Sequence, residues 1–259
     1  YLQRQKSVGA GLNVDKDLLA LFMSEFSYVD TTDQAKTWSE ILADFSSGSP
    51  MHRLICGDVG FGKTEVAVRA SFVVCSNRLH VLVLAPTTIL CRQLFLCFKK
   101  RLGLFGFSVG HVSRLSKHNI KTMSLFISGG VDVLVGTHGI IKNNEALKAA
   151  SLIIVDEEHR FGVEQKERIL EFSPSCHFLS MSATPIPRSL QLSISGVRNI
   201  STLFSPPISR KPVITNIYYF NKALVKSSVY SEISRGGQVY VVDNSVDNVL
   251  FLFSFLKDC

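Results

Sequence analysis

The sequence has six cysteines but no C-x-x-C pair, and its seven histidines form no cluster at the spacings that metal ligands use. These absences argue against a zinc site. Several of the cysteines lie inside apolar stretches, where cysteine behaves as a small hydrophobic residue. The pattern therefore predicts a reducing, cytoplasmic setting.

Long apolar runs are also missing. A membrane-spanning helix needs roughly 18 consecutive apolar residues, and the longest candidate near the chain end, 249–256, is far shorter. No signal peptide, internal repeat or low-complexity tract is visible, so we expect no membrane association. Because the chain starts at Tyr1 rather than Met and stops at Cys259 within an apparent helix, we expect a fragment of a larger protein.

Acidic residues are in the minority. The sequence has 28 lysines and arginines against 21 aspartates and glutamates, which gives a formal net charge of +7. A basic balance favours a polyanionic partner such as a nucleic acid. The alternative is an ordinary solvated basic surface.

The most informative motif that is present is a glycine-rich loop between an apolar run and a helical pattern. It is a complete G-x-x-x-x-G-K-[ST] phosphate loop formed by Gly57, Asp58, Val59, Gly60, Phe61, Gly62, Lys63 and Thr64. Its backbone N–H groups surround phosphate oxygens, its lysine reaches the outer phosphates and its hydroxyl binds Mg²⁺. The loop predicts binding of a nucleoside triphosphate; the alternative is a glycine-rich turn that binds nothing.

Short β-branched or leucine-rich runs alternate with helical patterns along the chain. The predicted buried strands are 53–56, 81–85, 131–135, 152–155 and 178–181. Helical spacing of apolar residues precedes the phosphate loop at 35–45 and follows it at 66–74. The alternation predicts an α/β fold in which helices cover both faces of a parallel sheet.

A second motif places carboxylates directly after a predicted buried strand. The run 152–155 is followed by Asp156, Glu157, Glu158 and His159. Ligands of α/β proteins bind at the carboxyl edge of the sheet, and phosphoryl transfer needs one carboxylate for Mg²⁺ and another to orient water. Asp156 and Glu157 suit these roles; the alternative is a cap on the next helix.

The two motifs and the triplet Ser182-Ala183-Thr184 resemble motifs I, II and III of the superfamily 2 helicases in order and context. A narrower resemblance, to RecG and the bacterial transcription-repair coupling factors, is carried by 57–65, 156–162, 183–188, 195–201 and 235–240. The last two stretches are more similar to the coupling factors than to RecG. The resemblance covers nearly the whole chain and implies a RecA-like P-loop NTPase that uses ATP and Mg²⁺.

The resemblance assigns the nucleotide site. Phe26 would pack on the adenine and the Gln34 amide would read its edge; the alternative for Phe26 is a staple that packs the following helix. The implied catalytic residues are Lys63, Asp156 and Glu157, with Thr64 and Asp156 as ligands of Mg²⁺. The full nucleotide-binding set is Phe26, Gln34, Gly57, Asp58, Val59, Gly60, Phe61, Gly62, Lys63, Thr64 and Glu65.

The same resemblance assigns contacts with the DNA backbone. Hydroxyls, loop amides and a cation suit phosphate contacts that do not read bases. The implied residues are Thr87, Thr88, Ser113, Arg114, Thr137 and His138. The alternative for each is an ordinary turn or a helix cap.

Three further residues are implied to couple the state of the nucleotide to that of the DNA: His159, Ser182 and Thr184. A histidine beside the carboxylates can make that link through hydrogen bonds, and a structural role is the alternative. Arg188 follows two prolines, and the sequence leaves open whether it contacts nucleic acid or a neighbouring lobe.

The expected organisation has four parts: a linker and helix over 1–25, a first RecA-like lobe over 26–204, a connector over 205–216 and the incomplete start of a second lobe over 217–259. Pro206 and Pro207 prevent regular structure in the connector. In the last part, 239–242 is predicted to be a strand and 246–256 the apolar face of a helix.

The leading functional prediction is an ATP-dependent double-stranded DNA translocase or helicase module of transcription-coupled DNA repair. In this family a second lobe supplies an arginine that completes the ATP site, and no Gly-Arg-x-Gly-Arg element follows Gln238. We therefore expect ATP binding with weak turnover for this chain. RNA polymerase and damage-recognition proteins are implied as partners only through domains of the parent protein that this chain lacks.

Two alternatives to this function remain. One is a RecG-like fork helicase or an RNA helicase. The other is an ATP-responsive DNA-binding module without hydrolysis of its own.

Overall fold

The computed structural model describes residues 11–114, 116, 118–183, 199–207, 210 and 213–257. The chain divides into two compact units, Tyr1–Arg210 and Lys211–Cys259. The division falls inside the predicted connector.

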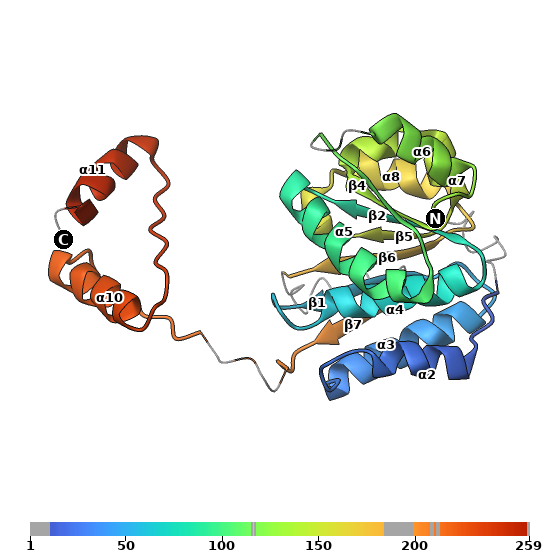
Figure 1. Ribbon diagram of the computed structural model, residues 1–259, viewed down its shortest axis with the longest axis horizontal. Coiled ribbons are helices and arrows are strands. Elements are labelled where there is room, and N and C mark those ends of the chain that lie inside the picture. Colours follow the sequence, from blue (N-terminus) through green and yellow to red (C-terminus); the bar gives the residue numbers. More distant parts are fainter. Residues whose placement is uncertain are drawn as a thin grey trace. The chain divides into compact units, whose positions relative to one another are not determined.

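The described part of the first unit is built on a parallel sheet of seven strands with the order β3-β4-β2-β5-β6-β1-β7 (Figure 1). The strands are β1 (His52–Gly57), β2 (His80–Ala85), β3 (Val109–Val112), β4 (Val133–Thr137), β5 (Ala150–Val155), β6 (His177–Ser182) and β7 (Asn199–Leu203). All five predicted strands are confirmed, although β4 begins two residues later than expected. The edge strands β3 and β7 were not predicted.

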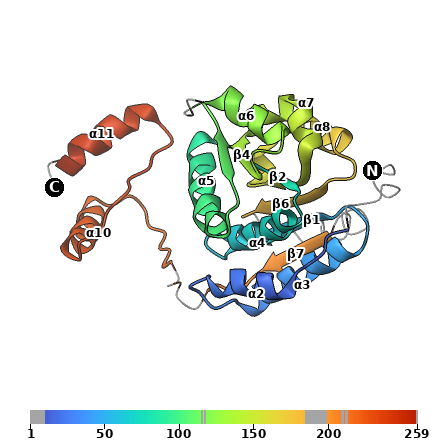
Figure 2. The ribbon, with the colours of Figure 1, turned by 45° about the vertical axis from the view of Figure 1, so that its right-hand side comes forward.

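Both faces of the sheet are buried. Successive residues of a strand point to opposite faces, so a strand covered on both sides contributes alternately to two cores. In β2, Val81 and Val83 belong to one core, whereas Leu82 and Leu84 belong to the other. The first core includes residues of α2 (Lys16–Ser24), α3 (Thr32–Ser46), α4 (Lys63–Ser76) and α5 (Thr88–Leu102). The second includes residues of α6 (Asn119–Ile127), α7 (Asn144–Ala149) and α8 (Val163–Phe172) (Figure 2). The prediction of helices on both faces is thus confirmed.

The described part of the amino-terminal segment packs into the first core. Leu12, Leu19 and Phe22 are buried, and the Phe22 ring stacks on Phe72 of α4 with ring centroids 4.0 Å apart. Helix α2 begins after Asp15, whose side chain accepts hydrogen bonds from two backbone N–H groups. The packing of α2 therefore fixes the chain that leads into Phe26.

A buried arginine stabilises the β7 edge of the sheet. Arg53 of β1 contacts Glu40 at 2.7 Å and Asp44 at 2.6 Å, both on α3. It also donates to the Ser201 hydroxyl of β7 at 2.7 Å. This cluster ties α3, β1 and β7 together, which explains how the polar strand β7 is held at the sheet edge.

The second unit contains α10 (Lys222–Ser234) and α11 (Val246–Lys257). The helix predicted at 246–256 is confirmed, but the strand predicted at 239–242 is wrong. A strand needs a hydrogen-bonded neighbour, and the described residues of this unit contain no strand that 239–242 could pair with. Tyr240 and Val242 are accordingly 86% exposed. No helix among the described residues has the length and apolar character needed to cross a membrane.

Candidate nucleotide site and nucleic-acid edge

The phosphate loop connects the carboxyl end of β1 to the first residue of α4. Gly60 and Gly62 have φ angles of +82° and +83°, a region that other residues avoid. A Cβ atom on Gly57 would lie 2.8 Å from Leu203 Cβ of β7, and one on Gly62 would lie 2.2 Å from the Gln34 amide nitrogen. The glycines therefore allow both the turn and the close approach of its neighbours.

Lys63 lies inside this loop. Its side chain is buried, and Nζ donates hydrogen bonds to the carbonyl oxygens of Gly57 at 2.6 Å and Asp58 at 3.0 Å. Burial lowers the pKa of Lys63, although the charges of Glu157 and Asp156 oppose that shift. The ammonium group is thus directed into the loop and lies close enough to the two acids to feel their charge.

The acidic motif follows β5, and β6 separates β5 from β1 in the sheet. Burial, and then the charge of Glu157, raise the pKa of Asp156. Glu157 has a left-handed backbone with a φ angle of +49°, which is uncommon outside glycine and is often found at functional sites. Its Oε2 atom is buried and has no hydrogen-bond partner among the described residues. Two motifs far apart in the sequence therefore meet at one edge of the sheet.

The oxygen atoms available here fit Mg²⁺. The Thr64 hydroxyl and the Asp156 carboxylate are hard oxygen ligands of the kind that this cation prefers. Within the described ranges, no group of three or more His, Cys, Asp or Glu side chains could hold a metal alone. A divalent cation at this edge would therefore complete its shell with phosphate oxygens and water, as Mg²⁺ commonly does.

We predict that Asp156→Asn raises the thermal stability of the ligand-free chain at neutral pH. Folding raises the pKa of this carboxyl above its ordinary value of 3.8. The free energy of unfolding therefore falls as the pH rises from 3.8 through the raised pKa, because ionisation is harder in the folded state than in the unfolded state. Asparagine carries no charge and still accepts the hydrogen bond that Glu157 N–H donates to Asp156 Oδ1 at 3.0 Å. Thermal melts from pH 4 to 8 check this.

The gap in melting temperature between this variant and the parent should shrink as the pH falls towards 3.8. The variant should also lose the extra stabilisation that Mg²⁺ gives in the presence of ATP. An asparagine variant less stable than the parent at pH 8 without ligand would contradict the assignment.

A cavity of about 330 Å³ lies beside the phosphate loop, and Phe26, Gln34, Gly60, Gly62 and Glu65 are among its lining residues. Phe26 is half-buried. Helix α3 has its N-cap at Thr31, so Phe26 does not occupy the position before the cap that a hydrophobic staple uses. The structure places the ring on the cavity wall.

Gln34 is held by two hydrogen bonds. Its Oε1 accepts from Thr31 N–H at 2.9 Å, which completes the capping box of α3, and its Nε2 donates to the Phe61 carbonyl at 2.8 Å. One lone pair of Oε1 and one hydrogen of Nε2 remain. The amide therefore faces the cavity in a fixed orientation with one acceptor and one donor to spare.

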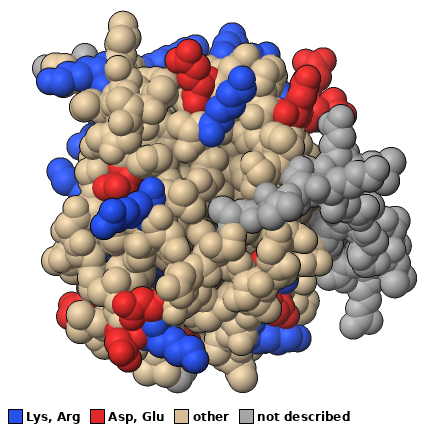
Figure 3. Space-filling model, turned by 90° about the vertical axis from the view of Figure 1, so that its right-hand side faces the viewer, with Lys and Arg blue, Asp and Glu red and all other residues tan. Residues whose placement is uncertain are grey.

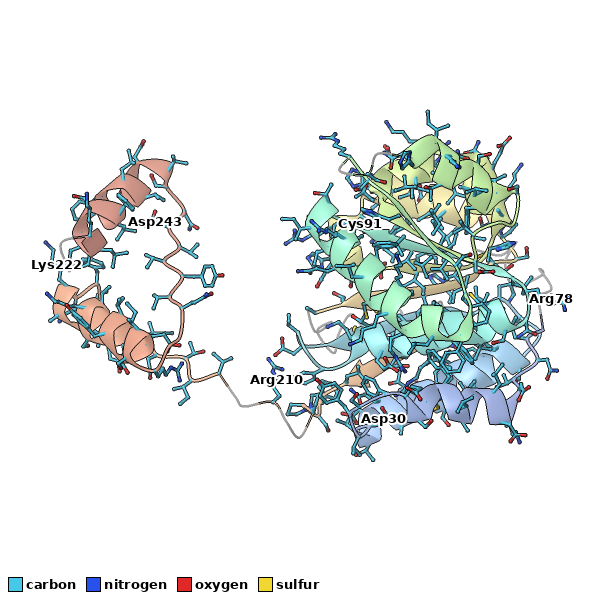
Figure 4. All side chains as sticks on the ribbon, in the orientation of Figure 1. Asp30, Arg78, Cys91, Arg210, Lys222 and Asp243 are labelled. Atoms are coloured by element: carbon cyan, nitrogen blue, oxygen red, sulfur yellow. The ribbon has the colours of Figure 1, made fainter. Side chains whose placement is uncertain are left out.

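Arg210 lies beside the phosphate loop, although no sequence motif predicts it there. Its guanidinium lies 4.8 Å from the centroid of the Phe61 ring and 3.3 Å from Asp58 Oδ2, and it lines the same cavity. The hydrogen bond from Val59 N–H, and then the contact with Arg210, lower the pKa of Asp58. The phosphate loop is thus contacted from a residue at the end of the first unit (Figure 4).

The residues assigned to DNA follow three neighbouring strands. Thr87 and Thr88 come after β2, Ser113 and Arg114 after β3, and Thr137 and His138 end or follow β4. Because β3, β4 and β2 are adjacent and parallel, these positions share the carboxyl edge with the nucleotide motifs. The edge thus has a nucleotide half at β5, β6 and β1 and a second half at β3, β4 and β2.

The exposure of this second half is uneven. Arg114 and His138 are exposed, whereas Ser113 is buried. The Thr87 hydroxyl accepts a hydrogen bond from Leu90 N–H at 3.2 Å and caps α5. This is the helix-cap role that was the alternative to DNA contact for Thr87. Arg114 and His138 are therefore the assigned side chains best placed to meet a partner.

Two of the three residues implied in coupling, His159 and Ser182, belong to the described part of the chain. His159 Nδ1 is 3.3 Å from Glu157 Oε2, and Ser182 ends β6 between the two nucleotide motifs. Thr184 and Arg188 lie outside the described residues. His159 is exposed, so it can contact both Glu157 and a group outside the protein.

Arg78 lies on the side of the first unit opposite Arg210 (Figure 4). On the face that Figure 3 shows, lysines and arginines are interspersed with acidic residues among neutral ones. The excess of basic residues therefore forms no continuous patch on that visible face.

A family model described as DEAD/DEAH box helicase matches residues 31–192, which is more than half of the chain. The transcription-repair-coupling factor of Borreliella burgdorferi is 42% identical over 259 residues, covering 99% of this chain and 23% of that protein. The factor of Escherichia coli is 39% identical, covering 96% of this chain and 22% of that protein. The chain thus spans about a quarter or less of the length of these curated relatives.

A solved structure of RecG bound to a three-way DNA junction superposes with a TM-score of 0.83 and 29% identity. The match covers 99% of this chain and 35% of that one. The predicted RecA-like fold and the predicted resemblance to RecG and the coupling factors are both confirmed.

Proposed function

Because the chain belongs to the DEAD/DEAH box helicase family, we propose that it is the ATP-dependent, double-stranded DNA translocase or helicase module of a transcription-repair coupling factor. The observation that carries the proposal is the sheet order, which brings the phosphate loop after β1 and the acids after β5 to the same edge on either side of β6. Residues 26–204 would form the first RecA-like lobe, and 217–259 would begin a second. RNA polymerase and damage-recognition proteins would be partners of the whole protein only.

The proposed hydrolysis uses four side chains. Lys63 would leave the carbonyl oxygens of the loop for the outer phosphates, and Thr64 and Asp156 would hold Mg²⁺, which stabilises charge on the phosphate oxygens. Glu157 would orient the attacking water through Oε2, which is buried, lies 3.3 Å from His159 Nδ1 and makes no hydrogen bond among the described residues. The residues of the loop supply the N–H groups that bind phosphate.

The free donor and acceptor of Gln34 support adenine as the base. Adenine presents a donor at N6 and an acceptor at N7 on one edge, which complements the amide, whereas guanine presents two acceptors there. Oε1 of Gln34 would then face O6 of guanine without a hydrogen between them. The fixed amide therefore favours ATP over GTP.

DNA as the track is supported by the names of the relatives, by the RecG complex and by the second half of the edge. Arg114, His138 and the hydroxyl groups nearby would contact backbone phosphates, which carry no sequence information. His159 is exposed and contacts the Glu157 carboxylate, so a DNA phosphate that bound its ring would change that contact. DNA and nucleotide would thus occupy one continuous edge.

The test of this function compares ATP hydrolysis by the chain with linear duplex DNA, forked DNA and single-stranded RNA. Linear duplex is expected to stimulate phosphate release most, because phosphate contacts along two strands need neither a fork nor a 2′-hydroxyl. In the same assay, Arg114→Ala should weaken duplex binding and lower the slope of log affinity against log salt by about 1.

Arg78→Ala is the matched control, since it removes the same charge from the opposite side of the unit (Figure 4). It should leave both the affinity and the salt slope unchanged. Stimulation by RNA alone would exclude the DNA translocase. Nucleotide and DNA binding without any phosphate release would favour a binding module instead.

A further inference from the structure

The Phe26 ring is contacted by two buried cations. The guanidinium carbon of Arg69 lies 5.3 Å from the ring centroid and that of Arg101 lies 5.5 Å from it. Arg69 belongs to α4 and Arg101 to the end of α5, and both are at least nine-tenths buried. Cations at this distance are attracted to the face of an aromatic ring.

The two guanidinium groups lie together and do not bracket the ring. Arg69 Nε donates to Glu65 Oε1 at 3.1 Å, and Arg101 Nη2 donates to the same oxygen at 2.9 Å. Two groups bound to one oxygen atom cannot cover opposite faces of a ring at these distances. One face of Phe26 is therefore free of both arginines, and Phe26 lines the cavity beside the phosphate loop.

Each arginine is itself fixed. Arg69 forms a two-point pair with Asp30, with distances of 2.7 and 2.8 Å, and such pairs hold the plane of a guanidinium. Arg101 lies 4.5 Å from the Phe22 ring and 5.5 Å from the Phe26 ring.

Arg101 Nε and Nη1 are buried with no hydrogen-bond partner in the described chain. Hydrogen bonds to Glu65 and to the Phe22 carbonyl use only Nη2. The rest of the guanidinium therefore serves its contacts with the two aromatic rings.

We infer that Arg69 and Arg101 are positioning residues that hold Phe26 as a preformed platform for a nucleobase. The inference rests on the proposed function, because it needs a nucleotide whose phosphates bind the loop and whose base enters the cavity. A half-buried ring without this support would lose rotamer freedom on binding, which weakens affinity. Because Arg69 and Arg101 already hold the Phe26 ring in the folded protein, the ring loses little rotamer freedom when a base binds.

The platform should affect binding of the base and leave binding of the phosphates unchanged. The probes are therefore Mg²⁺ with ATP, and Mg²⁺ with inorganic tripolyphosphate, which has no base. Calorimetric titration of the whole chain measures both dissociation constants. The variants are Arg101→Lys, Phe26→Leu and the two combined, since lysine keeps a positive charge for Glu65 but lacks the planar group.

We expect Arg101→Lys to raise the dissociation constant of ATP about two- to tenfold, in the range of one cation–π contact, and to leave that of tripolyphosphate unchanged. Phe26→Leu should raise the ATP constant about tenfold or more, the scale of one stacked base. In the leucine background, Arg101→Lys should add less than about twofold, because both changes act through the same ring.

Arg53→Lys is the matched control, since Arg53 is another buried, doubly paired arginine that lies on β1 away from the cavity lining. It should change neither constant. Equal loss of ATP and tripolyphosphate binding in Arg101→Lys, or full additivity in the double variant, would overturn the inference. If the parent chain bound neither probe, the proposed function itself would fail.

Discussion

Replacing Lys63 by alanine is expected to abolish the thermal stabilisation that ATP and Mg²⁺ give the chain. A ligand present at 100 times its dissociation constant stabilises a folded protein by about 2.7 kcal/mol. The variant should show almost none of this gain at the same concentrations. Thermal melts of both proteins across a series of ATP concentrations measure the difference.

The size of the effect follows from the position of Nζ. It lies inside the loop, bonded only to the carbonyl oxygens of Gly57 and Asp58 in the described structure. Alanine leaves the backbone N–H groups of the loop in place but removes the buried cation that would face the outer phosphates. Charged hydrogen bonds contribute more than neutral ones, so the remaining N–H groups would not compensate.

The comparison depends on the ligand-induced shift, because alanine also removes two hydrogen bonds from the ligand-free loop. Lys166→Ala is a suitable control. Lys166 Nζ lies 3.3 Å from Glu158 Oε1 of the acidic motif, but Lys166 is not among the residues assigned to nucleotide binding. That variant should keep the full response to ATP. An unchanged response in Lys63→Ala would remove the basis for the nucleotide site.

The parts of the fold that the sequence predicts are those with strong local patterns. The central strands are continuous apolar runs because both of their faces are buried, and the phosphate loop has a fixed spacing of glycines. The edge strands are different. β3 contains Gly110 and His111, and β7 reads Asn-Ile-Ser-Thr-Leu, so each forms through its pairing with β4 or β1.

The strand predicted in the second unit illustrates the reverse case. The residues at 239–242 are all apolar or aromatic and suit a strand, yet the described structure gives them no partner to pair with. Local propensity is a weak determinant of sheet structure without a neighbouring strand. The sequence pattern alone therefore overestimates strand content here.

The candidate site divides in the same way. Lys63, Asp156 and Glu157 belong to short motifs and are predictable from them, whereas Arg101 and Arg210 belong to none. Arg101 reaches Glu65 across 36 positions, and Arg210 reaches Asp58 across 152. Contacts of this kind depend on how helices pack, and spacing along one segment carries no signal for them.

Changing Glu157 to glutamine is expected to separate binding from hydrolysis. Glutamine has the same shape and tolerates the same backbone, so the left-handed conformation at φ +49° should persist. It cannot take a proton from water, and loss of a general base typically lowers the rate by about 10²- to 10⁴-fold. Phosphate release measured with saturating duplex DNA should fall by that factor, while the thermal response to ATP is retained.

Glu164→Gln makes the same chemical change at an exposed position in the first turn of α8, and its rate should match the parent. Oε2 of Glu157 accepts no hydrogen bond among the described residues, whereas Oδ1 of Asp156 already accepts the Glu157 N–H. The buried Oε2 of Glu157 can therefore accept a hydrogen bond from water, which is why the base is assigned to Glu157. Hydrolysis at the parent rate in Glu157→Gln would transfer that role elsewhere, whereas loss of ATP binding would make Glu157 part of the binding site.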